Sequence, residues 1–331
     1  DAAPLLAPLA PPRVAHYCGH IFAAVGEAEA RLRAAIDAAL DDETVGFAYG
    51  ALAAGADILF AEALIARGAE LHIVLPFAEA DFLAQSVRPA GDGWEARYAA
   101  CRDQAASLTF ASETEFFGDG AQYGYGSRMA MGLARLRAEH LAAEAVQLAI
   151  WDGKAANGHA GTGIDVAAWR DGGGRSAVID PGSVDRSLTR PEPRVRSAYD
   201  RAVAAILFTD FAGFSTLSET ALPAFWDGVM RRVAEVLDRH GEEVACRNSW
   251  GDALYAVATS APAAAEIALE LQDALAAYDY ATLGLDGAGG MRIGVHYGPA
   301  WRADDPITGR TTFYGTEVSK AARIEPVTPP G

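Results

Sequence analysis

Short apolar runs alternate with longer amphipathic stretches between residues 13 and 180, and the two periods predict strands and helices in turn. Such alternation is typical of an α/β fold with a mostly parallel, Rossmann-like sheet. The predicted strands are Val45–Tyr49, Glu70–Pro76, Ser107–Ala111 and Val146–Trp151. The predicted helices are Ala28–Leu40, Asp57–Arg67, Trp94–Ala106, Arg128–Glu139 and Ile164–Trp169.

A second pattern covers residues 199–331 and predicts an α+β domain. Gly251-Asp252 falls between two apolar runs, where a hairpin turn is expected. The predicted strands and helices are, in order, strand Val203–Phe208, helix Glu219–His240, strands Glu243–Asn248 and Ala253–Val257, helix Pro262–Tyr278, strand Met291–Tyr297 and helix Thr316–Ile324.

Segments of low complexity separate these domains. Residues 1–12 are rich in Ala, Pro and Leu, and we interpret them as a linker or the tail of an upstream region. Residues 181–198, rich in Arg, Ser and Pro, are predicted to link the domains, together with the glycine run at 171–174. The chain ends in Pro329-Pro330-Gly331, which is typical of a loop before a further strand, so we expect the second domain to be truncated there.

Composition narrows the range of partners. The net charge of −17, from 27 basic and 44 acidic residues, argues against nucleic acids and anionic membranes as partners. No apolar run reaches the roughly 20 residues that a membrane-spanning helix needs. Cys18, Cys101 and Cys246 show no metal-binding spacing, so we expect reduced, buried thiols and a cytoplasmic location.

Two aspartates carry the candidate chemistry of the second domain. Asp210 follows an apolar strand, and Asp252 sits in the predicted hairpin turn, so an antiparallel sheet can place both at one end. Two carboxylates side by side need a cation or a raised pKa, and divalent metals prefer such hard oxygen ligands. The alternative is structural: a strand-end cap and an ordinary turn.

Four sequence blocks appear in order after the linker: FTDFAGFS at 208–215, NSWGDALYAV at 248–257, RIGVHYGPA at 292–300 and FYGTEVSKAARIE at 313–325. This arrangement resembles the catalytic domain of class III adenylate/guanylate cyclases, which adds a ferredoxin-like fold to the expectation. The resemblance implies that Asp210, Phe211 and Asp252 bind two Mg²⁺ or Mn²⁺ ions. It also implies that Ile206–Ser215, including Phe214, wraps the triphosphate with its backbone amides. The implied lyase reaction joins the ribose 3′-oxygen to the α-phosphate and releases pyrophosphate.

The same resemblance implies further site residues and an assembly. Arg323 matches the transition-state arginine, and Ser319 stands where the family has an asparagine. Asn248 and Thr312 stand at the two base-reading positions. Neither residue carries the charged side chain with which the family reads a purine base. ATP is the default substrate, and a pyrimidine triphosphate (CTP or UTP) is the alternative. Metal and arginine groups are expected from different protomers of a homodimer.

Two departures leave a second interpretation open. Asn248 and Ser319 are compatible with a catalytically inactive cyclase fold that serves as a nucleotide-binding or dimerisation module. Trp250, beside the predicted metal turn, is expected to pack at the dimer interface, with stacking on a base as the alternative.

The first domain carries glycine-bearing turns after strands, which can present backbone N–H groups to a phosphate. Its block GALAAGADILFAEALIARGAELHIVLPF at 50–77 is similar to the SLOG superfamily, which contains the Lonely Guy phosphoribohydrolases. The resemblance implies a nucleotide-like ligand and a sensing role that regulates the cyclase. An N-glycosidase using Asp165 is the alternative. The candidate ligand-binding residues are Gly50, Gly55, Gly161 and Thr162.

Two smaller clusters in the first domain contain residue types that can bind a metal or a base. His16, Cys18 and His20 are close enough in sequence to suggest a metal site, although a buried strand end explains them better. Tyr123, Tyr125 and Arg128 surround a glycine-rich stretch and are expected either to pack beside a flexible loop or to line a base pocket.

Overall fold

The computed structural model describes residues 10–23, 26–156, 158, 160–193, 199–285 and 290–331. Residues 1–9 of the predicted N-terminal linker and 194–198 of the predicted interdomain linker lie outside the described residues. The chain divides into two compact units, Asp1–Ser197 and Ala198–Gly331. Each unit is described by itself below.

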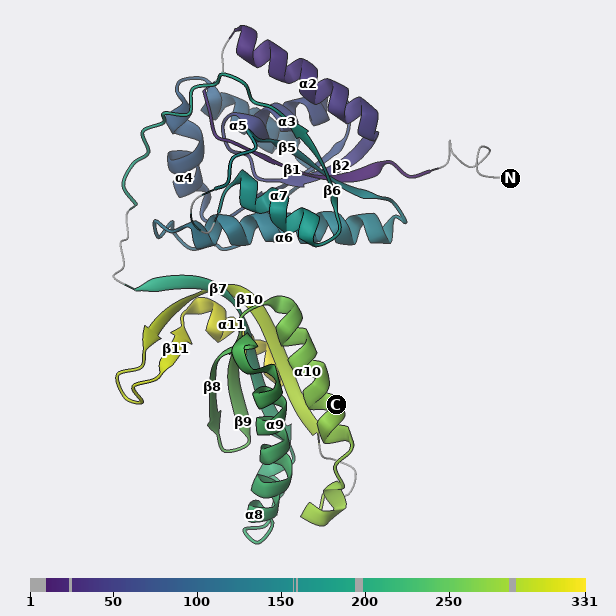
Figure 1. Ribbon diagram of the computed structural model, residues 1–331, viewed down its shortest axis with the longest axis vertical. Helices are drawn as coiled ribbons and strands as arrows, with labels where there is room; N and C mark the ends of the chain where they lie inside the picture. Colours follow the sequence, from purple (N-terminus) through teal and green to yellow (C-terminus); the bar gives the residue numbers. More distant parts are fainter. Residues whose placement is uncertain (1–9, 24–25, 157, 159, 194–198, 286–289) are drawn as a thin grey trace, which may run out of the picture. The chain divides into compact units, whose positions relative to one another are not determined.

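The first unit is built on a six-stranded sheet with the order β4-β3-β2-β1-β5-β6, and all of its pairings are parallel. Helices cover both faces: α2, α3 and α5 lie on one side and α6 and α7 on the other (Figure 1). The strands are β1 (Arg13–Gly19), β2 (Val45–Gly50), β3 (Glu70–Leu75), β4 (Ser107–Phe110), β5 (Ala145–Ile150) and β6 (Arg175–Ile179). The helices are α2 (Glu27–Glu43), α3 (Ala56–Ala66), α4 (Glu79–Phe82), α5 (Trp94–Gln104), α6 (Gly120–His140) and α7 (Thr162–Asp171).

Strand order places a switch point in the middle of this sheet. The chain moves outward from β1 through β2 and β3 to β4, and then returns to add β5 on the other side of β1. Open parallel sheets bind ligands beyond the carboxyl ends of the two strands at such a point. Here those ends are Gly19 and Ile150, which are paired in register.

Helix α6 begins at Gly120, eight residues before the predicted start at Arg128, so the expected glycine-rich loop is helical. Asp119 caps the helix by accepting a hydrogen bond from the N–H of Ala121 at 3.0 Å. A Cβ added at Gly126 would lie 2.9 Å from the Cα of Pro76. Glycine is therefore needed here for close approach of the helix rather than for flexibility. Strands β1 and β6 were not among the predicted strands.

The second unit is built on a five-stranded antiparallel sheet with the order β11-β10-β7-β9-β8. Helices α9 and α10 pack on one face, and α11 packs on the other, against β10 and β7. Figure 1 shows α9 and α10 side by side along the strands. The elements are β7 (Asp200–Ala212), α8 (Leu222–Phe225), α9 (Arg231–His240), β8 (Val244–Trp250), β9 (Ala253–Ala258), α10 (Ala261–Ala276), β10 (Gly290–Asp304), β11 (Thr311–Tyr314) and α11 (Thr316–Ile324).

Two strands are much longer than predicted, and one helix is interrupted. β7 and β10 pair along their length, from Gly290 opposite Ala212 to Arg302 opposite Asp200. The single helix predicted over Glu219–His240 is divided by a π-helical turn at Trp226–Met230. A Cβ at Gly228 in this turn would lie 2.4 Å from Tyr278 Oη. The backbone of the turn therefore packs closely against Tyr278, which follows the end of α10.

The predicted fold class is confirmed: a parallel α/β sheet is followed by an α+β unit with a ferredoxin-like strand order. Among the described residues, no helix combines the length and apolarity needed to cross a membrane.

Candidate functional site

The two predicted metal aspartates meet at one edge of the second sheet. β7 continues through Asp210 to Ala212, so Asp210 lies inside the strand rather than closing it, and Asp252 occupies the turn between β8 and β9. The backbone N–H of Phe211 donates to Asp252 Oδ2 at 3.2 Å. The carboxyl group of Asp210 lies close enough to Asp252 to raise its pKa. The structure thus brings together the three residues of the predicted metal group.

Electrostatics at this edge favour a cation. Burial raises the pKa of Asp252, and the charge of Asp210 adds to the shift. Two carboxyl groups in contact repel one another unless a proton or a cation lies between them. Their oxygens are the hard ligands that Mg²⁺ and Mn²⁺ prefer. The donor set therefore fits a divalent metal.

Arg292 supplies a positive charge to the same edge. It stands opposite Asp210 in the pairing of β10 with β7, and its guanidinium forms an ion pair with that carboxylate. Its Nε also lies 3.1 Å from Glu325 Oε1. Arg292 was not among the predicted site residues. Only the register of β7 with β10 shows that this arginine lies opposite Asp210.

The predicted triphosphate-binding segment is shorter than expected. Ile206 to Ala212 belong to β7 and are paired with neighbouring strands, so the expectation that the whole segment wraps a triphosphate is wrong for this part. The turn that can offer backbone amides begins at Gly213, whose φ of 95° suits glycine, and continues through Phe214 and Ser215. Phe214 packs against Phe225, whereas Ser215 is exposed.

The two predicted base-reading positions lie beside one tyrosine. Asn248 is paired with Tyr255, which in turn is paired with Phe208, and directly opposed residues share a face of the sheet. Thr312 lies close enough to Tyr255 to influence its pKa. Because Asp210 follows Phe208 by two positions, it shares the face of Phe208 and Asn248. Asp210 and Asn248 therefore occupy the same side of the sheet.

Ser319 and Arg323 lie four residues apart on α11, on one exposed stripe of the helix. Ser319 Oγ donates to the carbonyl of Gly315 at 3.4 Å. Two carboxylates of α11 and its C-cap, Glu317 and Glu325, have other partners: Glu317 binds His296 and Lys320, and Glu325 lies against Arg292.

Trp250 at the end of β8 is 88% exposed in a single copy of the chain, so its packing at a dimer interface stays a prediction. Within one copy of the chain its indole meets solvent. A buried role for this side chain therefore requires a second molecule, either a ligand or another copy.

In the first unit, a cavity of about 610 Å³ is lined by Cys18, Gly19 and His20, at the carboxyl end of β1. Two of the four predicted ligand residues, Gly161 and Thr162, line this cavity.

The other two predicted ligand residues, Gly50 and Gly55, do not line the cavity. A Cβ at Gly50 would lie 2.6 Å from the ring of Tyr17, and one at Gly55 would lie 2.8 Å from the backbone nitrogen of Phe22. These glycines permit close packing of chain segments.

The His16–Cys18–His20 segment is a buried strand and its end, as the preferred interpretation expected. His16 stacks on Trp169, and burial lowers its pKa to about 3, so it stays neutral. Its Nδ1 lies 3.2 Å from Gln147 Nε2.

The two tyrosines of the predicted cluster, Tyr123 and Tyr125, lie in different environments. Tyr123 lines the cavity, and its hydroxyl is hydrogen-bonded to Ser86 Oγ at 3.0 Å. Tyr125 is buried instead. Arg128 lies close enough to Asp165 to influence its pKa.

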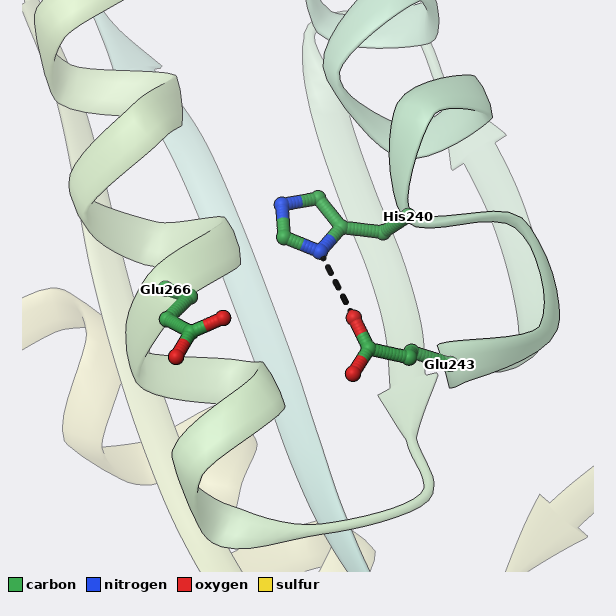
Figure 2. A group of neighbouring side chains, drawn as sticks. All are labelled: His240, Glu243 and Glu266. Carbon is green, nitrogen blue, oxygen red and sulfur yellow. Dashed lines mark hydrogen bonds and ion pairs between the residues drawn. The ribbon is translucent and has the colours of Figure 1, made fainter.

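One group of His, Cys, Asp and Glu side chains in the described part of the chain has ligand atoms close enough for a metal: His240, Glu243 and Glu266, all within 4.8 Å of one another. Figure 2 shows His240 directed at Glu243, with Glu266 on the neighbouring helix. His240 Nδ1 lies 2.9 Å from Glu243, and Nε2 lies 3.3 Å from Glu270. Nδ1 therefore already has a carboxylate partner, and Nε2 lies near Glu270 without a hydrogen bond, so side-chain contacts link α9 to α10 at this group.

Comparison with solved structures finds cyclase domains. The monomeric guanylyl cyclase domain of the RhoGC fusion protein from the aquatic fungus Blastocladiella emersonii is 18% identical, covering 40% of this chain and 78% of that chain, with a TM-score of 0.33. The guanylate cyclase domain of RhGC from Catenaria anguillulae, in complex with GTP, is 19% identical, with 40% and 75% covered and a TM-score of 0.34. The adenylyl cyclase CyaB from P. aeruginosa is 16% identical, with 40% and 76% covered and a TM-score of 0.35. No family model matches the chain, and a search of curated proteins finds no match.

Proposed function

We propose that the second unit is the catalytic domain of a class III nucleotide cyclase, which converts a nucleoside triphosphate to a 3′,5′-cyclic nucleotide and pyrophosphate. The observation that carries this proposal is that Asp210 and Asp252 lie close together at one end of the strands, with the N–H of Phe211 donating to Asp252. Both residues lie within the sequence blocks that resemble this family. A structural cap explains one such carboxylate, whereas two close together are stabilised by a cation or a shared proton.

Two Mg²⁺ or Mn²⁺ ions, held by Asp210, Asp252 and the backbone of Phe211, would make the ribose hydroxyl a better nucleophile and neutralise the leaving pyrophosphate. The turn from Gly213 to Ser215 follows Asp210 directly and offers backbone N–H groups to the phosphates. Carboxylates and turn together position the triphosphate beside the face that carries the base-reading residues.

Asn248 and Thr312 are proposed to contact the base. An amide and a hydroxyl each donate and accept hydrogen bonds, so neither selects a base by charge. ATP remains the default substrate, and CTP or UTP is the alternative. The exposed Trp250 offers a stacking surface on the same strand as Asn248.

Arg323 and Ser319 are proposed to act on the site of a second protomer. Their exposed stripe on α11 suits contact with another molecule, and a forked guanidinium matches the charge that develops on phosphoryl oxygens. Ser319 has a shorter reach than the asparagine of the family. Turnover slower by about 10²–10³-fold is therefore expected if that hydrogen bond is lost.

Product analysis tests this proposal. The full chain is incubated with Mn²⁺ and ATP, GTP, CTP or UTP in turn, and the products are resolved by mass. One cyclic nucleotide is expected from the native protein. Asp210→Asn is expected to abolish it, because one metal carboxylate is lost. Asp227→Asn, an exposed aspartate that pairs with Arg231 on the same unit, serves as the matched control and should retain the product.

The alternative function is an inactive cyclase fold that binds nucleotides or mediates dimerisation, which the Asn248 and Ser319 departures favour. Binding of a triphosphate by the folded protein without pyrophosphate release from any of the four substrates would establish this alternative and overturn the cyclase proposal.

A further inference from the structure

A histidine and glutamates from two helices gather where α9 packs against α10. His240 is the last residue of α9, and Gly241, with a φ of 45°, turns the chain so that Glu243 comes back beside it. Glu266 and Glu270 lie four residues apart on α10, and therefore on one face of that helix. One ligand atom from each of His240, Glu243 and Glu266 lies within 4.8 Å of the others, so all three can reach one ion (Figure 2).

The imidazole of His240 is buried with one nitrogen unsatisfied. Its side chain is only 8% exposed, and its Nδ1 lies 2.9 Å from Glu243 Oε2. Its Nε2 lies 3.3 Å from Glu270 Oε1, yet makes no hydrogen bond with any described residue. A buried polar atom without a hydrogen bond is costly. This group therefore differs from a cluster of solvated acidic side chains.

The number of protons on the imidazole explains why this arrangement suits a cation. A neutral imidazole carries one N–H group, so only one of its two nitrogens can donate to a carboxylate. The other nitrogen then turns a lone pair toward a carboxylate oxygen. A metal ion on Nδ1 removes this conflict, because Nδ1 and Glu243 share the ion while the N–H at Nε2 donates to Glu270. Metal-bound histidines commonly donate their second N–H to a carboxylate in this way.

The charges around His240 leave a negative excess. Glu266 and Glu270 carry like charges at a spacing where they repel one another on a helix. Arg239 offsets one of them, because its Nη2 lies 3.1 Å from Glu270 Oε2. In the described part of the chain, the carboxylates of Glu243 and Glu266 have no arginine or lysine partner. A divalent ion would offset both of these charges.

We propose that His240 Nδ1, Glu243 and Glu266 bind a divalent transition-metal ion such as Zn²⁺, with Glu270 accepting from the second imidazole nitrogen. One imidazole and two carboxylates form a set of three protein ligands, which Zn²⁺ completes with water. The imidazole favours Zn²⁺ over Mg²⁺, which prefers oxygen ligands alone. The site lies at the opposite end of β8 from Asp252, and the proposal does not depend on cyclase activity.

Calorimetric titration of the full chain with ZnCl₂, in a buffer that contains excess Mg²⁺, tests the proposal. The protein carries Asp210→Asn and Asp252→Asn, so that the carboxylates of the proposed active site do not contribute. Zn²⁺ is expected to bind despite the Mg²⁺. It is also expected to raise Tm, because an ion that binds only the folded chain stabilises it, and here the ion joins the end of α9 to α10.

Glu243 and Glu242 provide a matched pair of substitutions in one turn. Both residues are exposed, so neither change should disturb folding. Glu243→Gln removes a charged ligand, and affinity for Zn²⁺ is expected to fall by about tenfold or more. Glu242→Gln removes an equal charge that is not a ligand, so affinity should stay close to that of the parent protein.

Glu266→Gln extends the test to α10 and should weaken Zn²⁺ binding to a similar degree. Unchanged Zn²⁺ affinity in folded Glu243→Gln or Glu266→Gln would overturn the proposal. So would the absence of Zn²⁺ binding to the folded parent protein, since a second proton would then satisfy His240 in place of a metal.

Discussion

At the scale of single residues, Asp210, which is proposed to bind a metal, is already paired with a cation of the chain itself. Arg292 forms an ion pair with Asp210 and also lies against Glu325. A divalent ion that binds Asp210 must therefore compete with a guanidinium for the same carboxylate. The competition follows from Coulomb's law, because the positive charge beside the site disfavours a second one.

Replacing Arg292 by Gln is expected to strengthen metal binding. Removal of a partly exposed ion pair is worth about 1 kcal/mol, which corresponds to about a fivefold lower Kd for Mn²⁺. The measurement is Mn²⁺ titration followed by electron paramagnetic resonance, without nucleotide, so it does not depend on turnover. Arg302→Gln, an exposed arginine on the same strand, should leave Kd unchanged. Equal or weaker Mn²⁺ binding by Arg292→Gln would contradict the competition.

The candidate residues of the proposed site could be named from the sequence, because the proposed metal, base and arginine positions lie within short sequence blocks. The blocks could not show that Arg292 stands opposite Asp210, since this follows from the register of two strands separated by most of the domain. Nor could they show that His240 is buried beside carboxylates, with one nitrogen unsatisfied among the described residues. A histidine in the last turn of a helix is common, and only the packing around it makes this one unusual.

At the scale of elements, glycines decide how closely helices pack. α6 contains Gly126, where a Cβ would lie 2.9 Å from the Cα of Pro76, and Gly132, where a Cβ would meet nothing within 4 Å. The same residue type thus has opposite consequences six positions apart. The predicted loop at 124–127 was wrong because glycine indicates flexibility in sequence, yet here it serves close contact.

These two glycines provide a matched pair of substitutions. Gly126→Ala is expected to lower the free energy of unfolding by about 1–3 kcal/mol, because backbone must shift to admit the methyl group. Gly132→Ala is expected to raise it by up to about 1 kcal/mol through higher helix propensity. Urea denaturation monitored by circular dichroism measures both. Equal effects of the two substitutions would show that the contact with Pro76 does not govern packing.

At the scale of the whole molecule, the proposed active site is distributed between two copies of the chain. Asp210 and Asp252 form one part at the sheet edge, whereas Ser319 and Arg323 occupy an exposed stripe of α11. The exposed Trp250 also requires a second molecule if it is to be buried. Closed twofold dimers commonly build such shared sites.

Mixing two inactive variants tests the shared site. Asp210→Asn and Arg323→Ala are each expected to be inactive alone, because each removes one component of every site. In a mixed dimer, one site carries both defects and the other carries neither. Equal mixing should therefore restore roughly a quarter of native activity, since about half of the dimers are mixed. Cyclic nucleotide formation is the measurement, and no recovery in mixtures shown to exchange subunits would exclude the arrangement.

The sequence by itself determined the order of most elements, apart from β1, β6 and β11, together with the two fold classes and the identity of the candidate aspartate pair, because hydrophobic period and short motifs are local properties. Tertiary structure alone decided which residues lie opposite one another and which are buried. Strand register brought Arg292 to Asp210, and helix packing buried His240 beside Glu270. Register and burial depend on contacts between residues far apart in the chain, and no local pattern contains them.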